Sequence, residues 1–273
     1  MLRTTIALSV RLVVIAVTSI LDSNSPSSST AILYTDVDYA VYNDAAKYCH
    51  QNGSPFDRHT YRYTPYLAQL LSLQFYLPRG FFQAIFGKVI FSLSDILCGV
   101  ILLKCLVRIG TRASKAVRVV EIGWLFNPFV INISTRGSAE SLIVLLPVLG
   151  ALLLALGARG LGRAFLAGVV HGISIHTKLY PVIYTAGYII FLGRNNRKMD
   201  SNRNRNRNRN RNRNHGMFTN AIFDCMTPWA ISFGVGCVLG FVTPTFFVWK
   251  VYGEVSSVLV ACLLLFCSLC PAL

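Results

Sequence analysis

Long apolar segments separated by polar connections constrain this chain more than any other feature of its sequence. The chain is 53% hydrophobic and only 14% charged, whereas a soluble domain carries about 25% charged residues. A run of about 20 apolar residues can cross a bilayer, and backbone at membrane depth must satisfy its own hydrogen bonds as a helix. We therefore predict an all-α, polytopic membrane protein. Eight apolar segments are expected to be helical, the shorter ones tilted or re-entrant: 6–21, 86–107, 117–133, 142–158, 164–176, 181–193, 226–248 and 255–270.

Basic residues indicate which side of the membrane each connection faces. Cytosolic connections carry an excess of Lys and Arg, and three connections show that excess: 108–118, 159–163 and 194–215. The connections between them then face the lumen, and the largest of these spans 22–85. Six acidic residues fall on the same side, in agreement with this orientation: Asp22, Asp36, Asp38, Asp44, Asp57 and Glu140.

The connection 194–215 also explains much of the net charge of +15. It carries nine positive charges and contains the repeat SNRNRNRNRNRNRN at 201–214, so the charge does not indicate a nucleic-acid partner. A low-complexity polar run cannot bury a core. We predict a disordered cytosolic Asn/Arg loop produced by a tolerated repeat expansion.

The N-terminal segment, Met1 to Leu21, fits either a signal peptide or a first transmembrane helix. Arg11 interrupts its apolar run, whereas a signal peptide needs an unbroken apolar core and a small-residue cleavage site. We therefore expect a retained helix in which the Arg11 side chain snorkels to the interface. Both alternatives leave the following connection in the lumen.

Two carboxylates follow this first segment, in YTDVDYAVYNDA. Asp36 and Asp38 lie at the membrane face, where charged residues are costly and are candidates for function, and a polar, aromatic-rich loop follows them to Arg79. One carboxylate is a candidate general base, or both are candidate metal ligands. The alternative is that Asp38 only caps a helix predicted over 38–50, which leaves Asp36 unexplained. A DxD pattern by itself is a weak motif.

Four cationic residues of the lumenal connections are candidates for binding a phosphate: Arg62, Arg136, His176 and Lys178. Arg62 stands between two tyrosines in YRYTP, which is equally typical of an interfacial anchor. Arg136 has an acid four residues away, so a simple pair with Glu140 is the alternative. Lys178 alternatively snorkels at the interface.

Two local patterns predict further features of the chain. Asn127-Pro128 lies inside the segment 117–133 and should bend it, because proline cannot donate the helical hydrogen bond. Asn52-Gly53-Ser54 is an acceptor sequence for N-glycosylation on the predicted lumenal side, although such three-residue matches are common.

Three blocks, in the order in which they occur, carry a resemblance to a known family. They are YTDVDYAVYNDAAKYCHQNGSPFDRHTYRYTPYLAQLL, NPFVINISTRGSAESL and GISIHTKLYPVIY. Together they resemble the GPI mannosyltransferase 1 family, which adds the first mannose of the glycosylphosphatidylinositol anchor. The resemblance covers Ile6 to roughly Glu254, apart from the Asn-Arg insertion. Each block alone is modest, but three ordered blocks with a consistent topology are specific.

The resemblance implies a GT-C-type glycosyltransferase of the endoplasmic reticulum membrane, with about eight transmembrane helices and a large, catalytic lumenal first loop. It implies dolichyl-phosphate-mannose as the donor and glucosaminyl-(acyl)phosphatidylinositol as the acceptor, joined in an inverting α-1,4 transfer. It also implies a small membrane subunit that stabilises the catalytic one.

This chemistry suggests roles for the candidate residues. A single inverting displacement needs a base for the acceptor hydroxyl, for which Asp36 is our first choice and Asp38 our second. Cationic groups must hold the donor phosphate as negative charge develops on it, and we rank them in this order: Lys178, Arg136, Arg62 and His176. No cofactor is certain from the sequence, and a divalent cation bound by Asp36 and Asp38 is an open alternative.

The family pattern stops after Val251-Tyr252-Gly253-Glu254. We therefore expect a GT-C-like core over 1–254, which contains the loop 194–215, and a divergent apolar tail over 255–273. Chains of the family continue with further helices, so we expect a truncated chain whose own activity is in question.

Other functions stay open at this point. Another dolichyl-phosphate-sugar-dependent transferase would share the topology and the lumenal acid but use a different acceptor. An inactive truncated subunit would only bind the partner. A transporter would show paired repeats and charged or broken helices near the bilayer midplane, whereas here we find no repeat and the acids cluster in one lumenal loop.

Overall fold

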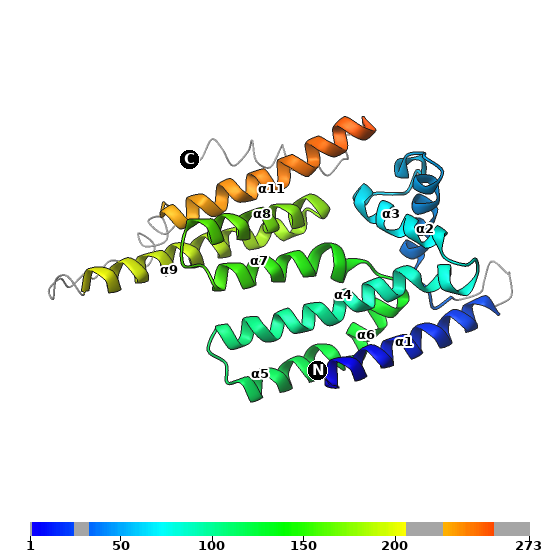
Figure 1. Ribbon diagram of the computed structural model, residues 1–273, viewed down its shortest axis with the longest axis horizontal. Helices are drawn as coiled ribbons and strands as arrows, with labels where there is room; N and C mark the ends of the chain where they lie inside the picture. The colour runs from blue at the N-terminus through cyan, green and yellow to red at the C-terminus, as the bar shows by residue number, and fades with distance from the viewer. Residues whose placement is uncertain (1, 25–32, 206–225, 254–273) are drawn as a thin grey trace. The chain divides into compact units, whose positions relative to one another are not determined.

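The computed structural model describes residues 2–24, 33–205 and 226–253 (Figure 1). The regular structure of these residues is helical, which confirms the all-α prediction. The chain divides into two compact units, Met1–Leu146 and Pro147–Leu273, a division that the hydropathy pattern did not contain. The predicted apolar tail 255–273 lies outside the described residues.

Three described helices are long and apolar enough to cross a membrane: Arg3–Ser23, Phe81–Arg108 and Pro228–Tyr252. A fourth span is possible if Ala113–Leu125 and Pro128–Arg136 form one helix broken by a bend of 49°. Seven of the eight predicted segments are described, and all seven are helical. Several of these helices are too short to span by length alone, so the number eight stays a prediction.

The first unit is built around one long helix, α4, which contacts most of the other helices of the unit. The unit contains α1 (Leu2–Ser23), α2 (Val37–His50), the short helix η1 (Pro55–Asp57), α3 (Pro65–Ser72), η2 (Leu73–Tyr76), α4 (Phe81–Arg108), α5 (Ala113–Val120), the π-helical turn η3 (Glu121–Leu125), α6 (Pro128–Arg136) and a second π-helical turn, η4 (Ser141–Leu145). Helices α1, α5 and α6 pack on α4, and α2 packs on α3.

The bend between η3 and α6 lies where the sequence predicted it. Asn127 has an extended backbone, and its side chain accepts a hydrogen bond of 3.0 Å from the amide of Phe129, so it caps α6. Pro128 occupies the first position of that helix, where its missing N–H has no helical partner to lose. The predicted bend at Asn127-Pro128 is therefore confirmed.

Arg11 of α1 is completely buried and pairs with Asp95 of α4. Its Nε and Nη2 atoms lie 3.0 Å and 2.6 Å from Oδ2 of Asp95, and its Nη1 atom donates to the carbonyl of Leu125 at 2.8 Å. The prediction that Arg11 snorkels to the interface is therefore wrong. The physical reason is that the next span supplies a carboxylate at the same depth, and a buried charge is tolerated when it is paired and hydrogen-bonded.

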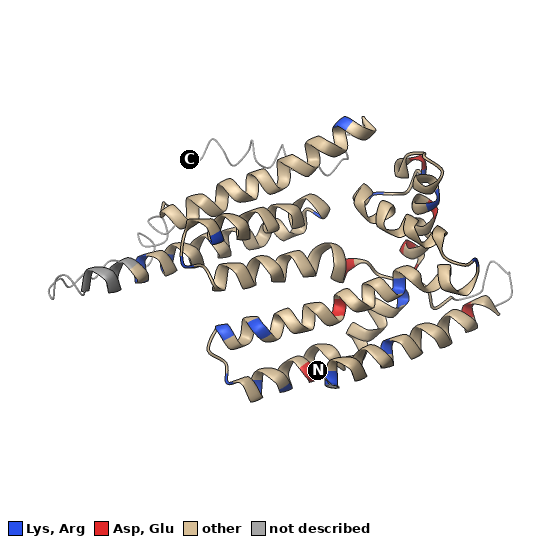
Figure 2. Cartoon of the chain, in the orientation of Figure 1, with Lys and Arg blue, Asp and Glu red and all other residues tan. Residues whose placement is uncertain are grey.

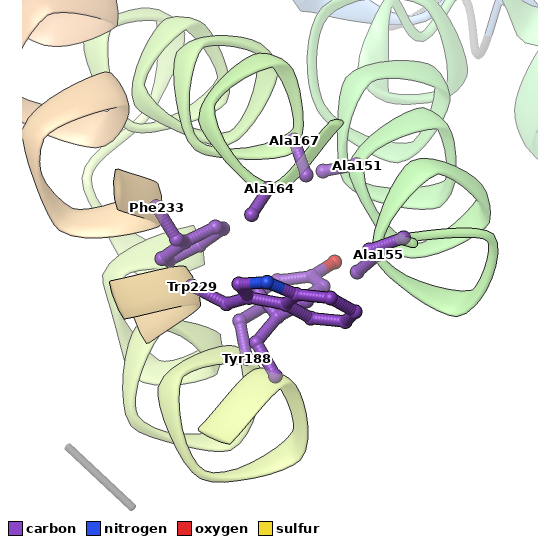
Figure 3. Packing of buried hydrophobic residues seen from close by; sticks show 9 residues of the cluster. Ala151, Ala155, Ala164, Ala167, Tyr188, Trp229 and Phe233 are labelled. Atoms are coloured by element: carbon purple, nitrogen blue, oxygen red, sulfur yellow. The ribbon is translucent and has the colours of Figure 1, made fainter. Parts of the chain in front are cut away.

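The second unit contains α7 (Leu146–Leu156), α8 (Leu161–Thr177), the 3-10 helix η5 (Tyr180–Tyr184), α9 (Thr185–Arg205) and α11 (Pro228–Tyr252). Figure 2 shows α7 without charged residues and α11 nearly so. A cluster in this unit packs aromatic rings against alanines of α7 and α8 (Figure 3), and its labelled members are Ala151, Ala155, Ala164, Ala167, Tyr188, Trp229 and Phe233. The small alanine side chains leave room for the rings, so this packing is close without a large aliphatic core.

Helices α8 and α11 approach each other closely through two glycine pairs. A Cβ atom built on Gly168 would lie 2.1 Å from the carbonyl oxygen of Phe233, and one on Gly172 would lie 2.2 Å from that of Cys237. The partners in α11, Gly236 and Gly240, have the same four-residue spacing and comparable contacts with α8. Small residues at this spacing are typical of helix pairs in membranes, because they let two backbones come into contact.

Helix α9 ends later than the predicted segment 181–193. It continues to Arg205 and so includes the first five residues of the Asn/Arg repeat. The predicted loop at 194–215 therefore begins within a helix, and the rest of the repeat lies outside the described residues.

We predict that Arg11→Met destabilises the protein by about 3–5 kcal/mol, because it leaves the Asp95 carboxylate buried without its partner. The double variant Arg11→Met, Asp95→Leu removes both charges and should recover most of that loss. The measurement is thermal unfolding of the purified protein in detergent. Equal destabilisation of the single and double variants would contradict this explanation.

We also predict that Gly172→Ala destabilises the protein by about 1–3 kcal/mol, because the added methyl group forces α8 and α11 apart. Gly187→Ala in α9 is the matched control, since a Cβ atom at Gly187 meets nothing within 4 Å. The control should be neutral or slightly stabilising, as alanine favours a helix by about 1 kcal/mol over glycine. The same unfolding measurement tests both variants, and similar behaviour of the two would argue against the close crossing.

Candidate active site

Asp36 is the residue that caps α2. Its backbone is extended, with φ −66° and ψ 143°, and its carboxylate accepts a hydrogen bond from the amide of Asp38 at 3.3 Å. The helix begins at Val37, so the alternative that Asp38 is the capping residue is wrong. The last extended residue takes the cap position, and Asp38 falls in the first turn, where a negative charge also suits the helix dipole.

Asp38 is exposed and accepts a hydrogen bond from a tyrosine of the same loop. The hydroxyl of Tyr63 lies 2.8 Å from Oδ2 of Asp38, and the Tyr63 ring meets Tyr42 edge to face at 4.7 Å between centroids. The pKa of Tyr63 is raised to about 12, mainly because burial desolvates the phenolate and also because of the hydrogen bond with Asp38. Tyr63 therefore stays protonated near neutral pH and continues to donate to Asp38.

The YRYTP motif places its residues in different environments. Tyr61 is buried and donates from its hydroxyl to the carbonyl of Thr64 at 2.7 Å, whereas Arg62 is exposed. Both tyrosines therefore take part in the packing of the loop. Arg62 directly precedes Tyr63, the hydrogen-bond partner of Asp38, in the sequence.

Arg136, the last residue of α6, contacts the segment before α2 through both its side chain and its main chain. Its Nε atom donates to the carbonyl of Tyr34 at 3.1 Å, and its own carbonyl accepts from the amide of Asp36 at 2.9 Å. The structure therefore brings Arg136 together with Asp36, which lies 100 positions earlier in the chain.

Gly137 allows the contact between α6 and α2. Its φ of +101° is a conformation that favours glycine, and a Cβ atom there would lie 2.6 Å from the ring of Tyr39. The hydroxyl of Tyr39 donates to the carbonyl of Ala84 at 3.0 Å and accepts from the amide of Gly87 at 3.1 Å. Tyr39 thereby joins the start of α2 to the start of α4.

These contacts place the DxD pair and the basic connection at opposite ends of α4. Tyr39 binds near the first turns of α4, whereas the basic connection 108–118 follows its last residue. A helix of 28 residues is about 42 Å long. Within the first unit, Asp36, Asp38 and Arg136 therefore share one end, as the predicted orientation requires.

His176 and Lys178 lie at the C-terminal end of α8 in the second unit. Nδ1 of His176 lies 2.9 Å from the hydroxyl of Thr245 in α11, and the amide of Lys178 donates to the carbonyl of Ser174 at 3.2 Å. Arg163 stands in the first turn of the same helix. His176 and Lys178 therefore lie at the end of α8 opposite Arg163 and the connection 159–163.

A family model described as "Mannosyltransferase (PIG-M)" matches residues 133–260. Curated proteins named GPI mannosyltransferase 1 match over longer stretches. The one from Emericella nidulans is 39% identical over 217 residues, which is 78% of this chain and 47% of that protein. The one from Saccharomyces cerevisiae is 43% identical over 61% of this chain and 38% of its own length. The one from Dictyostelium discoideum is 33% identical over 92% of this chain and 52% of its own length.

By sequence, the chain is a GPI mannosyltransferase 1 homologue. The family resemblance of the three blocks is thereby confirmed, and the matched relatives and domain are those of a glycosyltransferase. The chain spans about half the length, or less, of these relatives.

The sequence did not single out three further charged residues of this GPI mannosyltransferase 1 homologue. The sequence pattern placed Asp22 only among the acidic residues of the lumenal side, and Lys88 and Asp95 lie inside a predicted span. A charged residue within an apolar segment was the signal that could have found the last two, because such residues are expected to be paired or functional. Lys88 is only 2% exposed, and its amine donates to the hydroxyl of Thr35 at 2.7 Å.

A divalent cation has limited support from these side chains. Among the described residues, no group of three or more His, Cys, Asp or Glu side chains is arranged to hold a metal ion. Asp36 and Asp38 each use a carboxylate oxygen in a hydrogen bond. An ion at this pair would therefore need oxygen ligands from the substrates, as Mg²⁺ has in many phosphate sites.

Proposed function

We propose that this chain carries out the reaction expected from its sequence blocks. It would transfer the first α-1,4-linked mannose from dolichyl-phosphate-mannose to glucosaminyl-(acyl)phosphatidylinositol in GPI-anchor biosynthesis. The names of its relatives support the anchor pathway and the sugar. The observation that carries the proposal is the DxD pair, which is held at the start of α2 beside the ends of α4 and α6. Because the chain spans only about half of its relatives, the activity of the whole relatives is a proposal for this chain.

Asp36 is proposed as the general base of an inverting displacement. A base must lie within hydrogen-bonding reach of the acceptor hydroxyl, and Asp36 is partly buried and uses one oxygen in a long bond of 3.3 Å. Asp38 is the second candidate, since its hydrogen bond with Tyr63 is shorter, at 2.8 Å. The carboxylate that is not the base is available for the ammonium group of the acceptor glucosamine.

The donor phosphate is proposed to bind the cationic residues that the sequence selected. Negative charge develops on this phosphate as the sugar leaves, so preorganised cations stabilise the transition state. The proposed residues are, in order, Lys178, Arg136, Arg62 and His176. Exposed Arg62 is suited to a phosphate, because a guanidinium binds phosphate through two parallel hydrogen bonds.

The proposed location is the endoplasmic reticulum membrane, with the loop that contains α2 and α3 in the lumen. The positive-inside rule supports this orientation, and so do the opposite positions of the DxD pair and the connection 108–118 along α4. A small stabilising membrane subunit is proposed as the partner, together with the two lipid substrates.

We predict that expression of this chain restores surface GPI-anchored protein in cells that lack the first GPI mannosyltransferase, and that Asp36→Asn abolishes the rescue. Asparagine caps a helix as well as aspartate does, so this variant keeps the start of α2 and removes the base. Loss of a general base costs about 10²–10⁴-fold in rate. Flow cytometry reports the rescue, and immunoblotting confirms equal amounts in the membrane.

Asp44→Asn is the matched control, because Asp44 is exposed in the same loop and only pairs with Arg58 at 3.0 Å. It should rescue fully. Rescue by Asp36→Asn would leave Asp36 with a capping role alone. No rescue by the well-expressed wild-type chain would reject the activity proposed for this polypeptide and favour a subunit that only binds the partner, or a transferase with another acceptor.

We predict that Asn52 carries an N-linked glycan, because the loop is proposed to be lumenal. Asn52 is exposed and has a φ of +61° in the turn after α2, so its side chain is accessible to modification. Endoglycosidase treatment should increase the gel mobility of the wild-type chain and leave Asn52→Gln unchanged. An acceptor sequence inserted at 206–214 should stay unmodified, and a glycan there with none at Asn52 would reverse the orientation.

A further inference from the structure

The three residues before α2 are held by hydrogen bonds from three other helices, α1, α4 and α6. The carboxylate of Asp22, near the end of α1, accepts from the amide of Tyr34 at 2.9 Å through Oδ1 and from the amide of Thr35 at 3.0 Å through Oδ2. The hydroxyl of Thr35 also donates to Oδ2 of Asp22. Both oxygens of Asp22 are therefore used to hold the backbone one and two residues before Asp36.

We propose that Asp22 is a positioning residue for the carboxylate of Asp36. This inference rests on the proposed function, in which Asp36 is the base, and it adds a residue that touches neither substrate. Asp22 is itself a poor candidate for the base, because backbone and hydroxyl donors occupy both of its oxygens.

Hydrogen bonds fix most of the main-chain polar groups of this segment. Asp22 accepts from the amides of Tyr34 and Thr35. The side chain of Arg136 donates to the carbonyl of Tyr34, and its main-chain carbonyl accepts from the amide of Asp36. The hydroxyl of Tyr34 also lies 2.8 Å from that of Thr135 in α6. Hydrogen bonds in which one partner is charged are about twice as strong as neutral ones, so the contacts of the Asp22 carboxylate and of the Arg136 guanidinium are the strongest of this set.

Lys88 offers a competing explanation for Asp22. The buried Lys88 amine donates to the hydroxyl of Thr35 at 2.7 Å and lies 3.4 Å from that of Ser19. The same Thr35 hydroxyl donates to the Asp22 carboxylate. If Asp22 only balances the charge of Lys88, removal of both charges should be harmless. If Asp22 positions the segment, removal of both charges should still release the amides of Tyr34 and Thr35.

The position of the segment matters because catalysis depends on the placement of the reacting groups. A misplacement of about 1 Å can cost about 100-fold in rate. Asp36 is linked to Thr35 by one peptide bond, so movement of Thr35 moves the base. The expected signature is a lower kcat, because positioning a base affects the reaction step more than it affects substrate binding.

The experiment compares four variants with the wild-type chain in membranes that lack the first GPI mannosyltransferase. They are Asp22→Asn, Asp22→Ala, Asp22→Ala with Lys88→Met, and the surface control Asp44→Asn. Transfer of mannose from dolichyl-phosphate-mannose to glucosaminyl-acylphosphatidylinositol gives kcat and KM for each substrate. Hydrogen exchange of the purified proteins gives the protection of the amides of Tyr34, Thr35 and Asp36.

We expect Asp22→Ala and the double variant to lower kcat by about 10–100-fold with both KM values unchanged, and Asp22→Asn to lower it less, since one acceptor oxygen remains. Exchange of the three amides should rise in the same order, while amides inside α2 and the control stay as in the wild type. Wild-type kcat in the double variant would overturn the proposal in favour of charge balance.

The two proposals fail in distinguishable ways. If the wild-type chain transfers no mannose but the Asp22 variants still release the three amides, the proposed function is rejected, and Asp22 is shown to position the segment outside this reaction. If exchange of these amides does not change, or if the variants raise KM and leave kcat alone, the positioning role is overturned whatever the activity.

Discussion

The ion pair between Arg11 and Asp95 determines how the helices of the first unit meet. A hydrocarbon environment offers no water to a charged side chain, so each charge must find its partner inside the protein. Arg11 finds Asp95 in α4 and also the carbonyl of Leu125, close to the bend before α6. One guanidinium therefore links α1, α4 and the bend before α6. The C-terminal part of α1 and the whole of α6 follow these contacts in the chain.

The consequence reaches the candidate site at the end of the same helices. Asp22 stands one residue from the end of α1 and Arg136 is the last residue of α6, and both contact the segment that leads into α2. The carboxylate of Asp36 thus owes its position to its neighbours more than to its own single hydrogen bond. Such support is what a base needs, because its rate contribution depends on placement.

The two units solve the same problem of membrane packing by different means. Burial of apolar surface contributes little between helices that are already in lipid. The first unit uses buried polar pairs such as Arg11 with Asp95. The second uses direct backbone contact through Gly168, Gly172 and their partners in α11, together with rings packed on alanines. A charge change should therefore disturb the first unit most, and a size change the second.

Local pattern determined much of this protein in advance: the helical segments, the bend at Pro128, the helix after the DxD pair and the family of the three blocks. These follow from periodicity, proline chemistry and residue order, which act over a few positions. Tertiary structure decided the partner of Arg11 and the convergence of Asp22 and Arg136 on one segment. These contacts join residues 12 to 114 positions apart, and a hydropathy pattern contains no information about which distant side chains meet.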